Sequence, residues 1–284
     1  MLHRILIGVL VFAASPGQLL AHESAAHAHY VGNEGVLVER GATKVIFDAF
    51  YADSYGQYTL VPDSIRAALL AGTPPYDGID AVFVSHVHGD HFTAAPAVAF
   101  MRAHEKIPMY ASRQTYEAIV AEVGDSDSLL KRIIVADIAP GDSARSYKLK
   151  DLQIEVVSIP HAGGPSRADI QNLSWRVTLD DKTTVVHFGD AGPVEADFQR
   201  HAVHFAKRRA AAAFPPYWFL GNEAGKAIIA RYFNADQVIG IHVPASATGH
   251  GDELRKQLGG DVFTDPGEIR QLDTNHPAGA NRSD

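Results

Sequence analysis

The feature that most constrains the fold of this 284-residue chain is the stretch SHVHGDHF at residues 85–92. It places four candidate metal ligands within six residues: His86, His88, Asp90 and His91. Imidazole and carboxylate groups bind Zn²⁺ and similar divalent ions where thiolate is absent. The apolar run at residues 81–84 predicts a short buried strand that ends in this loop, and a helix is expected after it. Because a loop frees neighbouring residues from the alternation of a strand, the four side chains can converge on one point.

The same arrangement, an apolar strand followed by a His or an Asp, recurs three times later in the chain. The candidate ligands after those strands are His161, Asp190 and His242. Taken alone, His161 and His242 would more often be structural residues than ligands, and Asp190 could be an ordinary turn aspartate. A shared edge of layered sheets would gather all of them beside the His-rich loop, and the pattern therefore predicts one metal site built from four strand ends.

Composition limits the partners of the chain. Hydrophobic residues make up 46% and charged residues 20%, as in an ordinary globular protein. The formal net charge is −8, and the only basic clusters, at residues 131–132 and 207–209, fall in helix-like segments. We therefore expect a small-molecule substrate and no nucleic acid.

The N-terminal residues have the layout of a signal peptide. Arg4 precedes a largely apolar run at residues 5–14, and small residues follow around Ala21. We predict a signal peptide at residues 1–21 and a His-containing linker at residues 22–29; a buried N-terminal helix is the alternative. The mature protein is then expected to be periplasmic or secreted, without stable membrane insertion. The chain has no cysteine, which excludes disulfides and a lipid-modified cysteine anchor.

The motifs, in their order, resemble the metallo-β-lactamase superfamily. They are Asp48 after an early strand, the His86–His91 cluster, the lone His161, Asp190 in Phe-Gly-Asp-Ala, and the late His242. The resemblance covers roughly residues 30–265 and implies an α+β fold, an αββα sandwich of two packed mixed sheets flanked by helices. Residues 266–284 are predicted to be a polar C-terminal tail.

The resemblance also implies a role for each matching residue. One metal ion would be bound by His86, His88 and His161. The second would be bound by Asp90, His91 and His242. Asp190 would bridge the two ions, and Asp48 would brace the ligands from behind. The implied cofactor is a pair of divalent ions, zinc in preference to manganese or iron. His187, just before Phe-Gly-Asp, is expected to support the ligands without binding metal.

Two features indicate which branch of the superfamily the chain resembles. The lack of cysteine excludes β-lactamases that use a Cys ligand, and Asp190 is typical of the broader hydrolase group of lactonases, thioesterases and phosphodiesterases. The early stretch YVGNEG at residues 30–35 is most similar to the branch that contains ascorbate-6-phosphate lactonase and N-acyl-phosphatidylethanolamine phospholipase D.

Such a metal pair predicts hydrolysis by a metal-bound hydroxide, which would cleave an ester, lactone or phosphodiester bond. Asp90 and Asp190 are the expected catalytic residues, and Asp90 or a metal-bound water is the nearest proton donor for the leaving group. Two alternatives remain at this point: a metal-binding protein without turnover, and an iron-dependent redox protein of the same fold.

Aromatic residues supply the candidate substrate pocket. Tyr51 lies in an aromatic loop at residues 49–62, and Tyr217 and Trp218 follow a predicted strand, so these side chains would face each other across the metal-bearing edge. His250, in Thr-Gly-His-Gly, is a further candidate. Packing into the core is the alternative for the aromatic residues.

Overall fold

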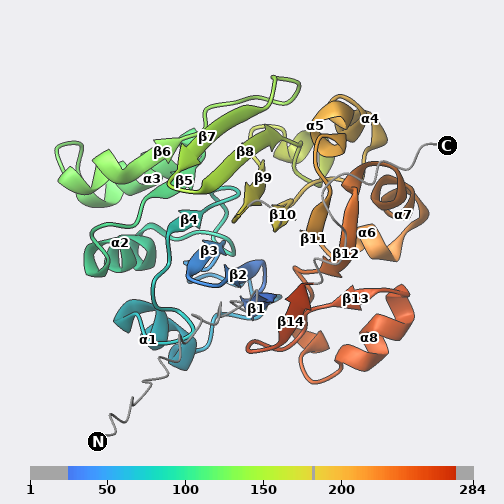
Figure 1. Cartoon of the computed structure of the whole chain (residues 1–284), viewed down its shortest axis with the longest axis horizontal. Coiled ribbons are helices and arrows are strands. Elements are labelled where there is room, and N and C mark those ends of the chain that lie inside the picture. Colours follow the sequence, from blue (N-terminus) through green and yellow to red (C-terminus); the bar gives the residue numbers. More distant parts are fainter. Residues whose placement is uncertain (1–24, 181–182, 273–284) are drawn as a thin grey trace, which may run out of the picture.

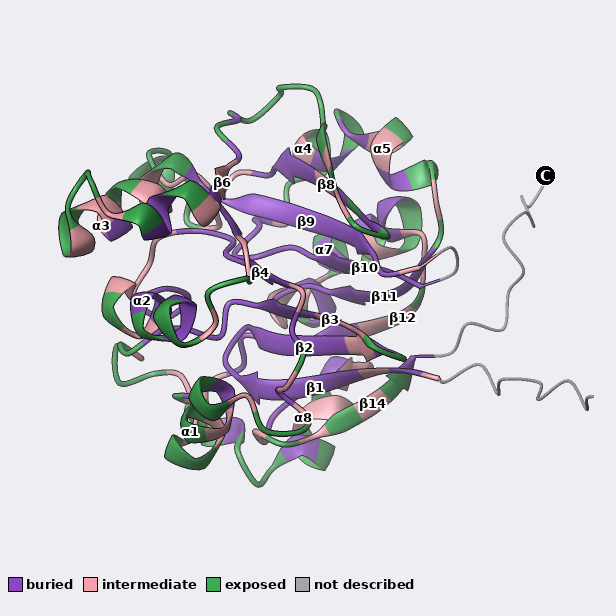
Figure 2. Ribbon diagram, turned by 60° about the vertical axis from the view of Figure 1, so that its left-hand side comes forward, coloured by how far each residue is buried: buried purple, intermediate pink, exposed green. Residues whose placement is uncertain are grey.

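Two β-sheets packed face to face form the centre of the computed structural model, and helices cover their outer faces (Figure 1). The structure describes residues 25–180 and 183–272. Buried positions follow the strands through the middle of the molecule, whereas exposed positions gather on the outer helices and loops (Figure 2). The predicted αββα sandwich is confirmed. No helix within the described residues is both long and apolar enough to cross a membrane.

The first sheet has seven strands in the order β14-β1-β2-β3-β4-β5-β6. Strands β14, β1, β2 and β3 pair antiparallel, and β3 to β6 pair parallel. Their bounds are β1 Ala26–Gly32, β2 Gly35–Arg40, β3 Thr43–Phe47, β4 Ala81–Phe83, β5 Met109–Ala111, β6 Ile133–Val135 and β14 Ile269–Leu272.

The second sheet also has seven strands, in the order β13-β12-β11-β10-β9-β8-β7. Strands β7 to β10 pair antiparallel, and β10 to β13 pair parallel. Their bounds are β7 Arg145–Leu149, β8 Leu152–Ser158, β9 Leu173–Thr178, β10 Thr184–His187, β11 Ala210–Phe214, β12 Ala235–Gly240 and β13 Asp261–Val262.

The main core lies between the sheets. Strand β8 shows how the sequence builds it, because Leu152, Ile154 and Val156 are buried while Gln153 is exposed, the alternation of a strand with one apolar face. Trp175 of β9 is fully buried, and its indole N–H donates to the carbonyl of Val84 at 2.9 Å. This bond ties the second sheet to the first just before the His-rich loop.

Helices α1 to α3 pack on the first sheet and α4 to α7 on the second, each group with its own apolar cluster. Ser112 caps α3, since its side chain accepts a hydrogen bond from the Thr115 amide. The bounds are α1 Asp63–Ala71, α2 Ala94–Ala103, α3 Arg113–Val123, α4 Glu195–Gln199, α5 Ala202–Ala206, α6 Trp218–Gly221, α7 Glu223–Ile228 and α8 Gly251–Leu258.

Three boundaries differ from the prediction. Residues 26–29, predicted as linker, form the start of β1, where Ala26 and Ala28 are fully buried. The predicted tail contains β14, which pairs with β1 from Ala26↔Leu272 to His29↔Ile269. The sequence over residues 194–209 predicts one helix, and the structure has two short ones there, α4 and α5. The predicted signal peptide lies outside the described residues.

The topology brings the ends of several strands to one edge. Strands β1, β3 and β4 run in one direction in the first sheet, and β8, β10 and β12 do so in the second. Residues that follow β4 lie within 4.8 Å of residues that follow β8, β10 and β12, so these carboxyl ends meet at the same edge of the sandwich.

Candidate metal centre

Every predicted ligand follows the carboxyl end of a strand. The His-rich loop follows β4, His161 follows β8, Asp190 follows β10 and His242 follows β12. The backbone at Asp48 and His242 is left-handed, with φ of +40° and +61°. Non-glycine residues rarely adopt this conformation, and such positions cluster at functional sites, where the surrounding structure enforces them.

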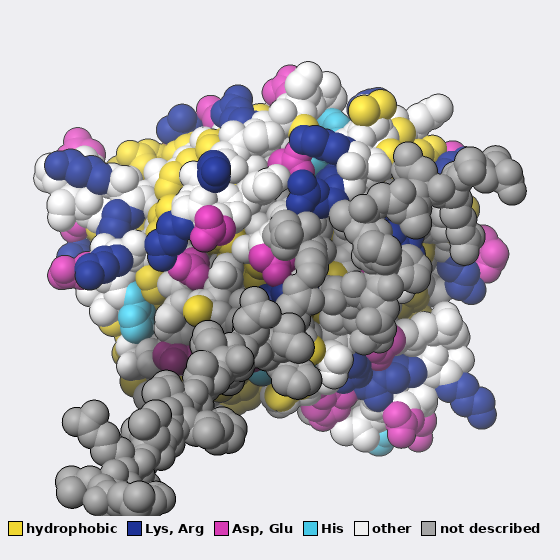
Figure 3. Space-filling model, in the orientation of Figure 1, with side chains coloured by type: hydrophobic (Ala, Val, Ile, Leu, Met, Phe, Trp, Pro, Cys, Tyr) yellow, Lys and Arg dark blue, Asp and Glu magenta, His cyan; other side chains and the backbone are white. Residues whose placement is uncertain are grey.

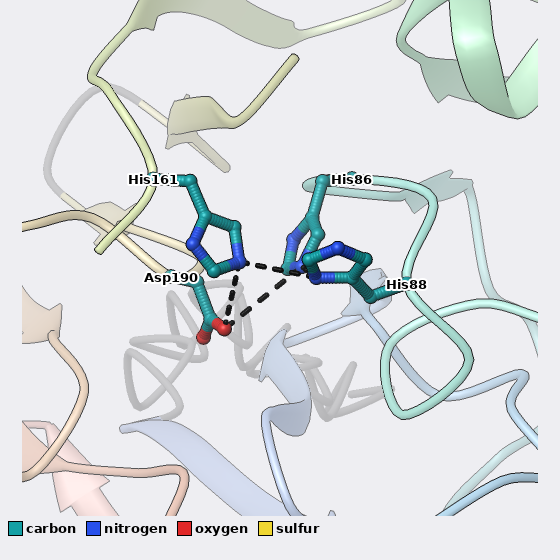
Figure 4. Close-up of side chains that lie close together, drawn as sticks. All are labelled: His86, His88, His161 and Asp190. Carbon is teal, nitrogen blue, oxygen red and sulfur yellow. Dashed lines mark hydrogen bonds and ion pairs between the residues drawn. The ribbon is translucent and has the colours of Figure 1, made fainter. Parts of the chain in front are cut away.

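The first group of ligand atoms comprises His86, His88, His161 and Asp190, which lie within 4.8 Å of one another (Figure 4). His88 Nδ1 lies 3.0 Å from His86 Nε2 and 3.1 Å from His161 Nε2. His161 Nε2 is also 3.1 Å from Asp190 Oδ2. Three imidazoles and one carboxylate thus point at a common centre.

The second group comprises Asp90, His91 and His242, again within 4.8 Å. Asp90 Oδ2 lies 3.3 Å from His242 Nε2 and 3.6 Å from His91 Nε2. Asp190 also reaches this group, because its Oδ1 is 3.1 Å from His242 Nε2 and 3.4 Å from His91 Nε2. The two oxygens of Asp190 therefore face different groups, Oδ2 the first and Oδ1 the second.

The chemistry of these atoms fits divalent ions. His91 Nε2, His242 Nε2 and Asp190 Oδ1 are buried and have no hydrogen-bond partner within the described residues. Polar atoms left in this way are costly, and a bound cation would satisfy all three. A set of imidazoles and carboxylates without thiolate suits zinc, manganese or iron.

The pKa values point the same way. Burial opposes charge on His242, but the nearby carboxylates of Asp190 and Asp90 raise the pKa of His242 to about 10. Burial likewise opposes charge on His91, yet Asp190 and Asp48 raise the pKa of His91 well above its ordinary value. In the metal-free protein, His91 and His242 therefore tend to be protonated beside Asp190. A bound cation would take the place of these two protons.

Burial acts differently on the first group. It lowers the pKa of His86 well below its ordinary value and that of His88 to about 4, and neighbouring histidines add to the effect. Both imidazoles are therefore neutral at pH 7 and have free lone pairs, the state in which histidine binds metal.

Asp48 supports the ligands from behind, in the position that was predicted for it. Its Oδ2 lies 3.0 Å from His91 Nδ1, and the carboxylate also accepts hydrogen bonds from the amide and the hydroxyl of Ser85. The same hydroxyl lies 3.0 Å from His86 Nδ1. His187 is more remote from the ligands: its Nε2 donates to the Glu34 carbonyl at 2.9 Å and its ring stacks on Phe47. Burial lowers the pKa of His187, which keeps the imidazole neutral.

The candidate pocket residues separate into two sets. Trp218 lies near the ligands, with its ring centroid 5.3 Å from that of His242 and its indole N–H donating to the Ala191 carbonyl, and Tyr217 packs against it. Tyr51, by contrast, is only 1% exposed and packs in the core, so its predicted place in a pocket wall is wrong. His250 is exposed and pairs with Glu253, away from the ligand groups.

Three more residues lie at this edge: Tyr58, which belongs to the predicted aromatic loop at residues 49–62, and Asn33 and Glu34, whose place at the site was missed from the sequence. Tyr58 places its ring 4.1 Å from that of His242, centroid to centroid, and burial together with Asp190 and Asp90 raises its pKa to about 12. Asn33 and Glu34 form the turn between β1 and β2 and are fully buried. The sequence offered one signal for Asn33 and Glu34: their turn follows β1, which runs in the same direction as β3, so the turn lies at the same edge as Asp48.

A family model described as the beta-lactamase superfamily domain matches residues 43–207, more than half of the chain. The chain belongs to this superfamily. Its fold and the His and Asp ligand groups are those expected from the resemblance in the sequence; the branch stays a prediction. No curated protein matches the sequence.

Solved structures of the same fold span several activities. A novel metallo hydrolase, Igni18, from Ignicoccus hospitalis is 17% identical, with a TM-score of 0.56 over 88% of this chain and 99% of that one. The metallo-beta-lactamase fold protein YhfI from Bacillus subtilis is 16% identical, with a TM-score of 0.57 over 88% of this chain and all of that one. The isothiocyanate hydrolase from Delia radicum gut bacteria is 14% identical, with a TM-score of 0.54 over 86% of this chain and 98% of that one.

Two further structures widen the range of activities. The short form of human tRNase Z is 12% identical, with a TM-score of 0.53 over 87% of this chain and 99% of that one. The E377D mutant of CmlA beta-hydroxylase is 14% identical, with a TM-score of 0.51 over 87% of this chain and 54% of that one. Likeness at this level of identity establishes the fold and leaves the reaction open.

Proposed function

We propose that the protein is an exported hydrolase with two divalent metal ions, most suited to zinc, that cleaves an ester, lactone or phosphodiester bond in a small molecule. The observation that carries the proposal is the position of Asp190. One of its oxygens lies 3.1 Å from His161 of the first group, and the other lies 3.1 Å from His242 of the second. A carboxylate with one oxygen toward each group is suited to bridge two ions.

Bound divalent ions would supply an activated water and would polarise the oxygen of the scissile group. Among the residues of the chain, Asp90 would transfer the proton from the water to the leaving group. Burial disfavours a charged Asp90, but the neighbouring imidazoles of His242 and His91 lower the pKa of Asp90 below the ordinary value. With Oδ2 turned toward those two histidines, Oδ1 is the atom that we assign to accept the proton of the water and return it to the leaving group.

Aromatic side chains support an apolar, uncharged substrate group. Tyr58 and Trp218 both lie against His242, and Tyr217 packs beside Trp218. Aromatic rings of this kind combine an apolar face with a polar tip. A small molecule is proposed rather than nucleic acid, because the chain carries a net charge of −8 and basic and acidic side chains are interspersed on the face shown in Figure 3.

The substrate class can be tested with protein purified without added metal. Metal content per chain would be measured, and turnover would be screened on ester, lactone, thioester and phosphodiester substrates, with a structured RNA as a further arm. Asp190→Asn keeps the shape of the side chain and is the inactive control, while His250→Ala is the active one. Hydrolysis that survives prolonged chelation, or that is unchanged in Asp190→Asn, would contradict the proposal.

The same preparation tests the alternatives. CmlA, named as a beta-hydroxylase, shares the fold, so iron in the purified protein together with substrate-dependent oxygen consumption would favour the redox alternative. RNA cleavage in the screen would overturn the proposed substrate class. Metal binding without turnover on any substrate would favour a binding protein.

Export is proposed from the leader at residues 1–21, with the protein periplasmic or secreted. The test is expression of the whole chain in a Gram-negative host, followed by fractionation and mass determination of the mature N-terminus. Recovery of the uncleaved chain in the cytoplasm would contradict it.

A further inference from the structure

The turn between β1 and β2 is unusual because it is buried. Asn33 and Glu34 form its two central residues, and both side chains are 0% exposed, whereas hairpin turns normally lie at the surface. The turn sits at the ligand edge because β1 ends there. Gly35 allows the close packing: a Cβ at this position would lie 2.9 Å from the Gly32 carbonyl oxygen and 3.2 Å from that of Asp48.

Asn33 holds two ligands of the second group. Its side-chain amide donates to the backbone carbonyl of Asp90 at 2.9 Å and lies 3.4 Å from the Asp90 carboxylate. Its own carbonyl accepts a hydrogen bond from the His242 amide at 2.9 Å. One residue thus fixes the position of Asp90 relative to His242, although they are far apart in the sequence.

Glu34 reaches the third ligand of that group. Its Oε2 lies 3.5 Å from His91 Nδ1, on the side of the ring that faces away from Asp90 and Asp190. Within the described part of the chain, neither carboxylate oxygen of Glu34 has a hydrogen-bond partner, even though the side chain is fully buried. Burial of a carboxylate without hydrogen-bond partners destabilises the folded protein, so packing alone does not explain why Glu34 is there.

The first group is supported by other contacts. His86 Nδ1 lies 3.0 Å from the Ser85 hydroxyl, and His161 Nδ1 lies 2.5 Å from the Ala162 carbonyl oxygen. Across residues 25–180 and 183–272, the turn makes no hydrogen bond or ion pair with His86, His88 or His161. Its contacts with ligand residues are therefore selective for the second group.

We propose that Asn33 and Glu34 are positioning residues for the second metal position, and that this turn sets the metal affinity of that position and not of the first. The inference rests on the two-metal site of the proposed function. Residues that orient ligands from behind typically change metal affinity about 10–100-fold when they are replaced.

The test is a metal titration of three variants against wild type. Asn33→Gly removes the amide and keeps a residue that tolerates the left-handed backbone, φ +44°. Asn234→Gly is the matched control, since Asn234 has φ +46° and lies in a turn remote from the ligands, where its side chain donates to the Phe205 carbonyl. Glu34→Leu keeps the approximate shape of the buried side chain and removes its oxygens.

Metal-free protein is titrated with Zn²⁺ against a chromophoric chelator, so that the two dissociation constants are resolved, and thermal unfolding of the metal-free protein is followed in parallel. In Asn33→Gly and Glu34→Leu the same one of the two constants is expected to rise 10–100-fold while the other changes less than twofold. Asn234→Gly should match wild type in both. Metal-free Glu34→Leu should be at least as stable as wild type, because a buried acid whose oxygens lack hydrogen-bond partners within the described residues is removed.

Equal weakening of both constants, or unchanged constants in the two turn variants, would overturn the inference. Wild type that binds two ions and hydrolyses none of the substrates would refute the proposed reaction and leave this inference standing. Wild type that binds one ion would refute both.

Discussion

Replacement of Asp48 by Asn would test whether its carboxylate, and not only its shape, organises the site. The side chain is 1% exposed and accepts from three donors: the Ser85 amide at 2.7 Å, the Ser85 hydroxyl, and His91 Nδ1 at 3.0 Å. Asparagine tolerates the left-handed backbone at this position better than alanine does. Its amide offers one acceptor oxygen, so at least one of the three donors must lose its partner.

The size of the effect follows from this count. A lost hydrogen bond to a charged group costs about 1.5–3 kcal/mol. In a domain of this size each kcal/mol lowers Tm by about 2–4 °C, so the metal-free variant should melt roughly 3–12 °C lower. Metal affinity should fall about 10–100-fold, since His91 loses the group that orients it.

Differential scanning calorimetry of the metal-free protein and chelator competition would measure the two effects. Asp127→Asn is a suitable control, because Asp127 also accepts from a backbone amide, that of Leu129, and pairs with Arg102, but far from the ligands. The control should keep wild-type metal affinity. If Asp48→Asn binds metal within twofold of wild type and melts at the same temperature, the carboxylate is not required and the reasoning is wrong.

Three further outcomes are expected. Asp190→Ala should abolish turnover and lower metal content, whereas His250→Ala should leave both near wild type in the same elemental and kinetic assays; comparable values in the two variants would contradict the assigned bridge. Zn²⁺ binding at pH 7 should release protons, measured by calorimetry in buffers of different ionisation enthalpy. The sign follows from His242, whose pKa rises from 6.5 to about 10, so that its proton is present at pH 7 and must leave, and apparent affinity should increase with pH up to about 10. Trp218→Ala should lower kcat/KM for bulky apolar substrates far more than for small ones, and equal losses on both would assign this ring to the core.

The site was more predictable from the sequence than the boundaries of the fold. The loop after β4 carries four candidate ligands within six residues, and the strands before His161, Asp190 and His242 are apolar runs with clear ends. Such signals are local, and the sequence therefore contains them. Their convergence depends only on the parallel direction of the strands, which the superfamily resemblance implied.

Features that depend on contacts between residues far apart in the sequence could not be predicted from local patterns. The Ala-His alternation at residues 26–29 has little strand propensity by itself and is ordered by pairing with β2 and β14. The break between α4 and α5 places Phe198 and Phe205 together against Phe188, a tertiary contact that helical periodicity does not reveal. The burial of Glu34 was missed because a Glu in a hairpin turn is ordinarily a solvated residue.

The ligand groups also join the two halves of the sandwich. His86 and His88 come from the loop of the first sheet, whereas His161 and Asp190 come from the second, and the other group is divided in the same manner between His91 and His242. The chain has no cysteine and therefore no disulfide. An ion bound at either position would cross-link the two sheets as a disulfide does in other proteins, because it would close a long loop between residues that are far apart in the sequence. Removal of the metal by a chelator should therefore first weaken the packing between the two sheets. The chain passes from one sheet to the other at residues 136–145, and we expect a protease to cleave there first.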